Sequence, residues 1–208
     1  EVEMVVVRQV VLWMMALSIM NATQANVATN YRTEIVTPHI IFNGDSRTVG
    51  MQHTVTEDED SVYVAESNQG YAWFVQNLDR VKASVTSNCV IIINFGVNDL
   101  VDAPHYVEKI NELQKEVSCE VYFMSVNPVD DDILAGKGNG LRNSMIEEFN
   151  ETMKSELGED VGYIDSYAYL MQEGYETVDG LHYSADTYRK IHNYCTKQVS
   201  QTKVVKVK

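Results

Sequence analysis

Basic side chains are scarce in this chain of 208 residues: 16 Lys and Arg stand against 30 Asp and Glu, for a formal net charge of −14. Without a basic patch the surface cannot neutralise phosphates, which excludes a nucleic-acid partner. No cysteine and histidine pair has zinc-ligand spacing, and no glycine-rich phosphate loop is present. We therefore expect a protein without a metal or a cofactor.

The chain also lacks an internal repeat and a linker that would mark a second domain. Its length suits one domain with a full-sized core. Two acidic runs, Glu57–Asp60 and Asp130–Asp132, lack the spacing and the glycine of an EF-hand calcium site. We interpret both runs as solvated loops.

The apolar run near the N-terminus, Val10 to Met20, is too short to span a bilayer comfortably. It follows Arg8 and precedes a small polar segment, Asn21 to Ala28, so it resembles the hydrophobic part of a secretory signal. We expect a signal peptide or N-terminal anchor over residues 1–28, a domain over 29–208, and a secreted or cell-surface protein. The alternatives are a helix that packs on the domain and, if the leader does not function, a cytoplasmic protein.

Short apolar runs alternate with helical patterns over the rest of the chain. Stripes at helical spacing include Leu141 to Leu157, and a last helix is expected over Ala185 to Val199. This alternation predicts a three-layer α/β/α domain with a doubly wound parallel sheet. The five expected strands are Ile35–Phe42, Val62–Ala65, Val90–Phe95, Val121–Val126 and Val161–Ile164, of which the third is apolar on both faces, as a central strand should be.

Two polar segments are predicted to be mobile surface loops. The first runs from Asp99 to Pro104 and the second from Asn127 to Gly140. The second is long enough to be a segment that covers a substrate.

The three cysteines allow at most one intramolecular disulfide. Cys195 falls on the buried face of the last helix and is interpreted as a core thiol. Cys89 and Cys119 each precede a predicted strand, and these strands should be neighbours. In an exported protein a disulfide here would close a loop of about 30 residues and stabilise the fold by roughly 3–4 kcal/mol. The alternative is that cross-strand geometry leaves both reduced.

The stretch from Ile40 to Ser46 reads as the end of a buried strand, a sharp turn at Gly44 and the opening of a helix. Ser46 would project from the carboxyl end of the strand, beside the positive end of a helix dipole. Open α/β sheets place their ligands there. Taken alone, Asp45 or Ser46 could equally be a helix N-cap.

Two other stretches give Ser46 a chemical context. Ile91 to Asp99 is a buried strand that runs into a polar loop, and Asp179 stands three residues ahead of His182. In this order the stretches resemble the SGNH, or GDSL-type, hydrolase family. The first block of the family is matched by Gly44-Asp45-Ser46, the second by Gly70, the third by Gly96-Val97-Asn98-Asp99 and the last by Asp179-Gly180-Leu181-His182.

The resemblance implies a flavodoxin-like strand order, 2-1-3-4-5, and a serine esterase. Ser46 would be the nucleophile and His182 its base, while Asp179 would orient the imidazole and stabilise its protonated form. The backbone N–H groups of Ser46 and Gly70 and the side-chain amide of Asn98 would form the oxyanion hole.

Two further residues are candidates to bind the substrate. Arg47 would bind a carboxylate or hydroxyl, and a structural ion pair with Asp45 or Asp99 is the alternative. Asn127, at the start of the second polar loop, is the other candidate. Asp45 and Asp99 themselves are expected to hold loops and helix N-termini.

The substrate class follows from analogy with the family and from the expected export. It comprises small acyl esters, such as O-acetyl groups of extracellular carbohydrate or cell-wall glycan. A lipase or thioesterase for longer acyl chains, with an apolar groove beside Ser46, is one alternative. A catalytically silent carbohydrate-binding module on the same fold is the other. We expect membrane contact only through an uncleaved N-terminal segment, and the oligomeric state is not predicted.

Overall fold

The computed structural model describes residues 31–57 and 60–206, so the predicted signal segment lies outside the described residues. Contacts divide the chain into two compact units, at Val36/Thr37 and at Ser200/Gln201. Residues 37–200 form the larger unit, which is shorter at both ends than the expected domain. No helix among the described residues has the length and apolar content needed to cross a membrane.

The larger unit is built on a sheet of five parallel strands, ordered β3-β2-β4-β5-β6. Numbered along the sequence, this is the expected order 2-1-3-4-5, so the predicted α/β fold is confirmed. Ile91 and Ile92 in the central strand are both fully buried, as a strand covered on both faces requires. The strands are β2 (His39–Gly44), β3 (Val62–Ala65), β4 (Cys89–Asn94), β5 (Glu120–Met124) and β6 (Val161–Ile164).

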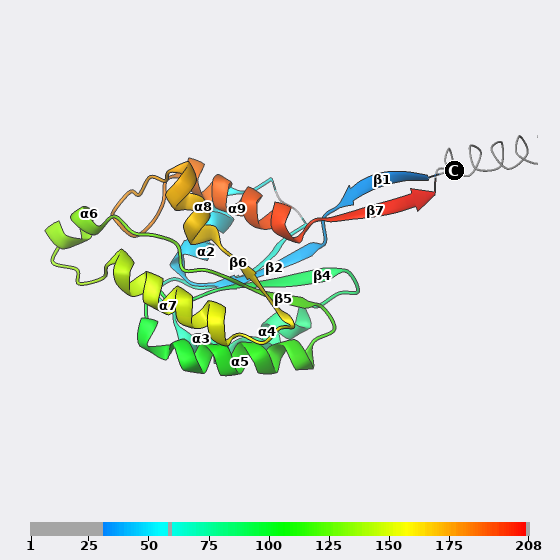
Figure 1. Ribbon diagram of the computed structural model, residues 1–208, viewed down its shortest axis with the longest axis horizontal. Coiled ribbons are helices and arrows are strands. Elements are labelled where there is room, and N and C mark those ends of the chain that lie inside the picture. The colour runs from blue at the N-terminus through cyan, green and yellow to red at the C-terminus, as the bar shows by residue number, and fades with distance from the viewer. Residues whose placement is uncertain (1–30, 58–59, 207–208) are drawn as a thin grey trace, which may run out of the picture. The chain divides into compact units, whose positions relative to one another are not determined.

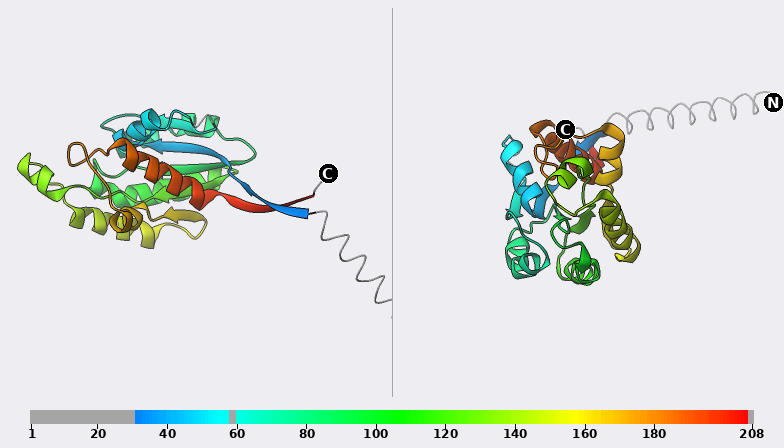
Figure 2. Two further views of the ribbon diagram at one scale, coloured as in Figure 1. Left: turned by 90° about the horizontal axis from the view of Figure 1, so that it is seen from above. Right: turned by 90° about the vertical axis from the view of Figure 1, so that its left-hand side faces the viewer.

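Helices cover both faces of this sheet (Figure 1 and Figure 2). Alternate strand residues feed two cores: Ile40 and Phe42 pack into one, and Ile41 into the other. The core containing Phe42 is closed by α2 (Ser46–Thr54), α8 (Ser166–Glu173) and α9 (Ala185–Val199). The opposite core is closed by α3 (Tyr71–Gln76), α4 (Leu78–Ala83), α5 (Ala103–Glu116) and α7 (Asn143–Glu156).

A separate two-stranded ribbon pairs β1 (Tyr31–Val36) antiparallel with β7 (Gln201–Lys206). The prediction of one strand over Ile35–Phe42 was therefore wrong, because the chain forms two strands there. Pro38 lies between them and has no N–H to donate to a ladder. The pairing of β7 was not predicted.

Both segments predicted as loops contain helical structure. The first holds the 3₁₀ turn η1 (Leu100–Asp102) and the start of α5, where a proline suits the first turn. The second holds α6 (Asp131–Gly136), whose N-cap Asp130 accepts a hydrogen bond from the N–H of Ile133. The acidic run read as a solvated loop is thus a helix start, where carboxylates are stabilised by the helix dipole.

All three cysteines are free thiols, so the predicted Cys89–Cys119 disulfide is absent. Val90 lies opposite Glu120 in the parallel ladder, which sets the two preceding cysteines side by side. Side chains on neighbouring parallel strands stand about 4.8 Å apart, and a disulfide needs a Cβ separation of about 3.8 Å. Burial, together with the Cys89 thiol, raises the pKa of Cys119 to about 12.

Candidate active site

Ser46 is the first residue of α2, and only Asp45 separates it from the carboxyl end of β2. The side chain of Asp45 caps this helix by accepting a 2.9 Å hydrogen bond from the N–H of Arg47. Gly44 does not have a positive φ, so the predicted reason for glycine at this turn was wrong. A β-carbon there would overlap the side chain of Thr48, and glycine is required by this close approach.

An unbroken chain of hydrogen bonds links Ser46, His182 and Asp179. Ser46 Oγ lies 2.9 Å from His182 Nε2, and His182 Nδ1 lies 2.8 Å from Asp179 Oδ2. Because an ionised carboxylate can only accept, Nδ1 carries the proton in this arrangement, and Nε2 is left to accept from the serine hydroxyl. The three residues are thus in the relative positions that a serine nucleophile, its base and an orienting acid require.

The Asp179 carboxylate accepts hydrogen bonds from backbone N–H groups of the Asp179–His182 turn as well as from the imidazole. Its Oδ1 accepts from the N–H of Leu181 at 2.9 Å and from the N–H of His182 at 2.7 Å. Burial by itself raises the pKa of Asp179, but the bonds from His182 and Leu181 outweigh it and lower the value to about 2. Gly180 has a φ of 92°, a conformation that glycine adopts without strain. The turn therefore keeps Asp179 ionised at neutral pH.

The predicted substrate-covering segment packs against this turn. The N–H of Asp130 donates to the carbonyl of Gly180 at 2.8 Å, and Lys137 Nζ donates to the carbonyl of Asp179 at 2.9 Å. A β-carbon at Gly180 would lie 3.0 Å from the side chains of Ile133 and Leu134 in α6. The segment therefore supports the turn from outside.

The expected oxyanion donors lie on loops that are tied to one another. Asn98 Nδ2 donates to the carbonyl of Gln69 at 2.7 Å. Asp99 accepts from the N–H of Tyr71 at 2.6 Å and from the Tyr106 hydroxyl at 3.0 Å. The first two bonds join the loop after β3 to the loop after β4, and Tyr106 in α5 holds the Asp99 carboxylate.

Gly70 lies at the centre of this junction. A β-carbon at Gly70 would overlap the Asp99 carboxylate, so the two loops can approach only over a glycine. Burial raises the pKa of Asp99 above its usual value, although the bond from the N–H of Tyr71 opposes the shift. Asp99 holds the N-terminus of α3 and Asp45 that of α2, as predicted for both.

The two predicted substrate-binding residues both lie inside the protein. The side chains of Arg47 and Asn127 are buried, with exposed fractions of 3% and 1%. Arg47 Nη1 donates to the carbonyl of Asn127 at 2.7 Å, and the guanidinium lies 5.5 Å from the ring centroid of Tyr183. No carboxylate in the described part of the chain forms an ion pair with Arg47, so the alternative of an ion pair with Asp45 or Asp99 is not observed.

Sequence reasoning missed several residues that support the site. Tyr106 is fully buried in the core, and its hydroxyl donates to Asp99. Tyr183 directly follows His182, and its hydroxyl donates to the carbonyl of Pro128. Adjacency to the histidine was the available signal for Tyr183. Among residues 31–57 and 60–206, no group of three or more His, Cys, Asp or Glu side chains could hold a metal ion.

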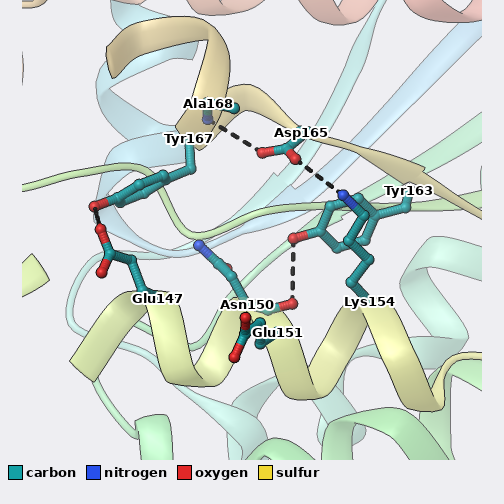
Figure 3. Close-up of a pocket in the computed structure, with 8 residues that line it drawn as sticks. All are labelled: Glu147, Asn150, Glu151, Lys154, Tyr163, Asp165, Tyr167 and Ala168. Carbon is teal, nitrogen blue, oxygen red and sulfur yellow. Dashed lines mark hydrogen bonds and ion pairs between the residues drawn. The ribbon is translucent and has the colours of Figure 1, made fainter. Parts of the chain in front are cut away.

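A hollow of about 290 Å³ lies between α7, β6 and the start of α8 (Figure 3). Several of the side chains that line it contact one another. Lys154 pairs with Asp165 at 3.3 Å and lies over the ring of Tyr163, and the Tyr167 hydroxyl donates to Glu147 at 2.7 Å. None of these contacts involves Ser46, His182 or Asp179.

Comparisons with known proteins agree with the fold. No family model matches the chain, and no curated protein matches it in sequence. Among solved structures, a lipase/acylhydrolase from Enterococcus faecalis matches with 17% identity over 77% of this chain and 94% of the other, at a TM-score of 0.62. A member of the lipolytic G-D-S-L family from Veillonella parvula matches with 19% identity over 76% and 96%, at 0.57. The acetylxylan esterase Axe2 from Geobacillus stearothermophilus matches with 14% identity over 78% and 94%, at 0.54. The chain thus has the fold of the GDSL, or SGNH-type, hydrolases that its sequence motifs resemble.

Proposed function

We propose that this chain is a serine esterase that hydrolyses small acyl esters. The observation that carries the proposal is the chain of hydrogen bonds from Ser46 through His182 to Asp179, with links of 2.9 and 2.8 Å. The fold shared with lipases and acylhydrolases supports an ester hydrolase.

In the first half of the reaction, Ser46 Oγ attacks the ester carbonyl carbon while His182 Nε2 takes the hydroxyl proton. The ionised Asp179 stabilises the imidazolium that forms. When the tetrahedral intermediate collapses, its bond to the alcohol oxygen breaks and the imidazolium gives its proton to the leaving alcohol. A water then repeats these steps on the acyl-serine, which releases the acid and restores Ser46.

The negative charge on the tetrahedral oxygen must be stabilised by hydrogen-bond donors other than those of the Asp179–His182 turn. The N–H of Ser46 belongs to the first turn of α2 and has no partner within the helix. The amide of Asn98 has two N–H groups, and the bond to Gln69 uses one. With the N–H of Gly70, they make three donors, each of which lowers the barrier by about 3–4 kcal/mol in such sites.

We propose O-acetyl groups of extracellular carbohydrate or cell-wall glycan as the preferred substrates. The acetylxylan esterase among the structural neighbours supports this acyl group, as does the expected export of the protein. One observation favours longer acyl chains as the second candidate. A partly apolar hollow of about 300 Å³ adjoins the segment that follows Asn98, and its lining combines Leu100, Val101, Ala103, Met145 and Phe149 with Glu148 and Thr152.

Hydrolysis of p-nitrophenyl acetate, butyrate and octanoate by wild type and Ser46→Ala tests the proposal. We expect Ser46→Ala to fall to near background and to keep its fold, because the change is small and exposes no core. We also expect the wild type to prefer acetate and to release acetate from acetylated xylan or peptidoglycan. A preference for octanoate would favour the second candidate. Equal rates in wild type and variant would refute the site and leave a binding module.

A further inference from the structure

Arg47 follows the proposed nucleophile and is buried without full compensation. Among the described residues, its guanidinium forms one hydrogen bond, from Nη1 to the carbonyl of Asn127, and Nε and Nη2 have no partner. Removing a guanidinium from water costs several kcal/mol unless its donors are paired. Hydrophobic packing would fill this place at lower cost, so fold stability alone does not explain the residue.

The segment Asn127–Asp130, here called the strap, connects Arg47 to the Asp179–His182 turn. Three successive carbonyls of the strap each accept from a different side chain: Asn127 from Arg47, Pro128 from Tyr183, and Val129 from Tyr175 at 2.9 Å. At its other end, the N–H of Asp130 donates to the carbonyl of Gly180 at 2.8 Å. The strap is thus bonded to α2 at one end and to the turn at the other.

Arg47 also contacts Tyr183, the residue that follows the turn. Its guanidinium lies over the ring of Tyr183 at 5.5 Å, a cation–π distance, and this ring is buried. Tyr183 pairs with Thr177 in a short antiparallel bridge that encloses Asp179 and His182. The position of the Tyr183 ring is therefore coupled to the position of the imidazole.

We propose that Arg47 is a positioning residue that sets the distance between Ser46 and His182, by way of Tyr183 and the strap. The inference rests on the proposed function. Ser46 and Arg47 are neighbours at the start of α2, so a contact that fixes one against the turn also fixes the other. Proton transfer requires heavy atoms about 2.6–3.2 Å apart, and a misplacement of about 1 Å can cost roughly 100-fold in rate.

The test compares Arg47→Met, Arg47→Lys and the matched control Arg80→Met, in which an exposed arginine on α4 loses one hydrogen bond to Asn77. We expect Arg47→Met to lower kcat roughly 10- to 100-fold and to leave KM within about twofold, because Arg47 touches no substrate. Lysine keeps a charge and a donor, so Arg47→Lys should recover at least half of the loss on a logarithmic scale. Arg80→Met should behave as wild type.

A second variant tests the route. Tyr183→Phe keeps the ring beneath Arg47 and removes the bond to Pro128, so we expect a smaller loss in kcat, about 3- to 10-fold. In the Arg47→Met background, Tyr183→Phe should lower kcat by a smaller factor than in wild type, because the two residues act through one path. Additive losses in the double variant would overturn this route.

Other results would overturn the inference as a whole. One is a kcat in Arg47→Met equal to that of wild type. Another is a rise in KM with unchanged kcat, which would mark a substrate-binding arginine. The third is failure of both Arg47 variants to fold. Absence of Ser46-dependent hydrolysis in the wild type would instead refute the proposed function. The imidazole N–H resonance of His182 separates these cases without turnover, since it should shift in Arg47→Met and stay in place in Arg80→Met. An unchanged resonance in Arg47→Met would exclude positioning.

Discussion

The two sides of the proposed site are built differently. The acid–base side takes Asp179 and His182 from one turn of four residues, in which the carboxylate accepts three hydrogen bonds from the turn itself. The oxyanion side takes its donors from Ser46, Gly70 and Asn98, which stand at the starts of α2 and α3 and after β4. One side is local in sequence, and the other exists only once the sheet has formed.

The difference determines which contacts each side needs. The backbone N–H groups of the turn hold the Asp179 carboxylate, which orients the imidazole, and the strap and Lys137 only position the turn. The oxyanion loops have no such local framework, so they are joined by the bonds from Asn98 to the carbonyl of Gln69 and from the N–H of Tyr71 to Asp99. Substitutions on the two sides should therefore produce different kinetic losses.

The largest losses are expected on the acid–base side, and they should be unequal. His182→Ala removes the base and should lower kcat by roughly 10⁵–10⁶, while Asp179→Ala leaves a base that is poorly oriented and should lower it by roughly 10³–10⁴. Steady-state hydrolysis of p-nitrophenyl acetate measures both. Asp186→Ala, an exposed carboxylate on α9, is the control and should keep wild-type activity. Equal losses in the two variants would mean that Asp179 does more than orient the imidazole.

An intermediate loss is expected on the oxyanion side. Asn98→Ala removes one of three donors, so kcat should fall by roughly 10²–10³, with KM little changed because the lost bond forms mainly in the transition state. The same assay measures this loss. Thermal unfolding followed by circular dichroism checks that losing the bond from Asn98 to Gln69 has not destabilised the fold. A rise in KM with unchanged kcat would assign Asn98 to ground-state binding and leave the oxyanion hole to the backbone.

The sequence predicted the parts of this molecule that local chemistry determines. Alternation predicted the five strands of the sheet, the family resemblance implied their order, and the short motifs identified Ser46 and the Asp179–His182 turn. Arg47 could not be placed, because its environment depends on Asn127 and Tyr183, which lie far along the chain. The ribbon of β1 and β7 was missed for the same reason, since its two strands come from opposite ends of the described chain. Cys89 and Cys119 were correctly expected to be neighbours, but side-by-side cysteines in a parallel ladder do not meet disulfide geometry.

The smallest effect on activity is expected at Asp45, which contrasts with Asp179. Asp45 is 2% exposed, and this burial raises its pKa from 3.8 to about 6, against the opposing charge of Arg47. The shift for Asp179 is opposite, so its contribution to stability is present above pH 3.8 and is lost as the pH falls toward 2. Asp45 holds its proton more tightly when folded, so its ionisation weakens the fold as the pH rises from about 4 through 6.

Asp45→Asn removes this ionisation and keeps an oxygen to accept from the N–H of Arg47. At pH 7 the variant should be more stable than wild type by up to about 3 kcal/mol, and near pH 4 the two should be equal. Urea unfolding at pH 4, 5.5 and 7 measures the difference between the two proteins, in which all other carboxylates cancel. Activity should change less than tenfold, because Asp45 holds a helix end and takes no part in the proton transfer. A stability difference that stays constant with pH would show that Asp45 is already ionised in the folded protein across this range, and the contrast with Asp179 would then disappear.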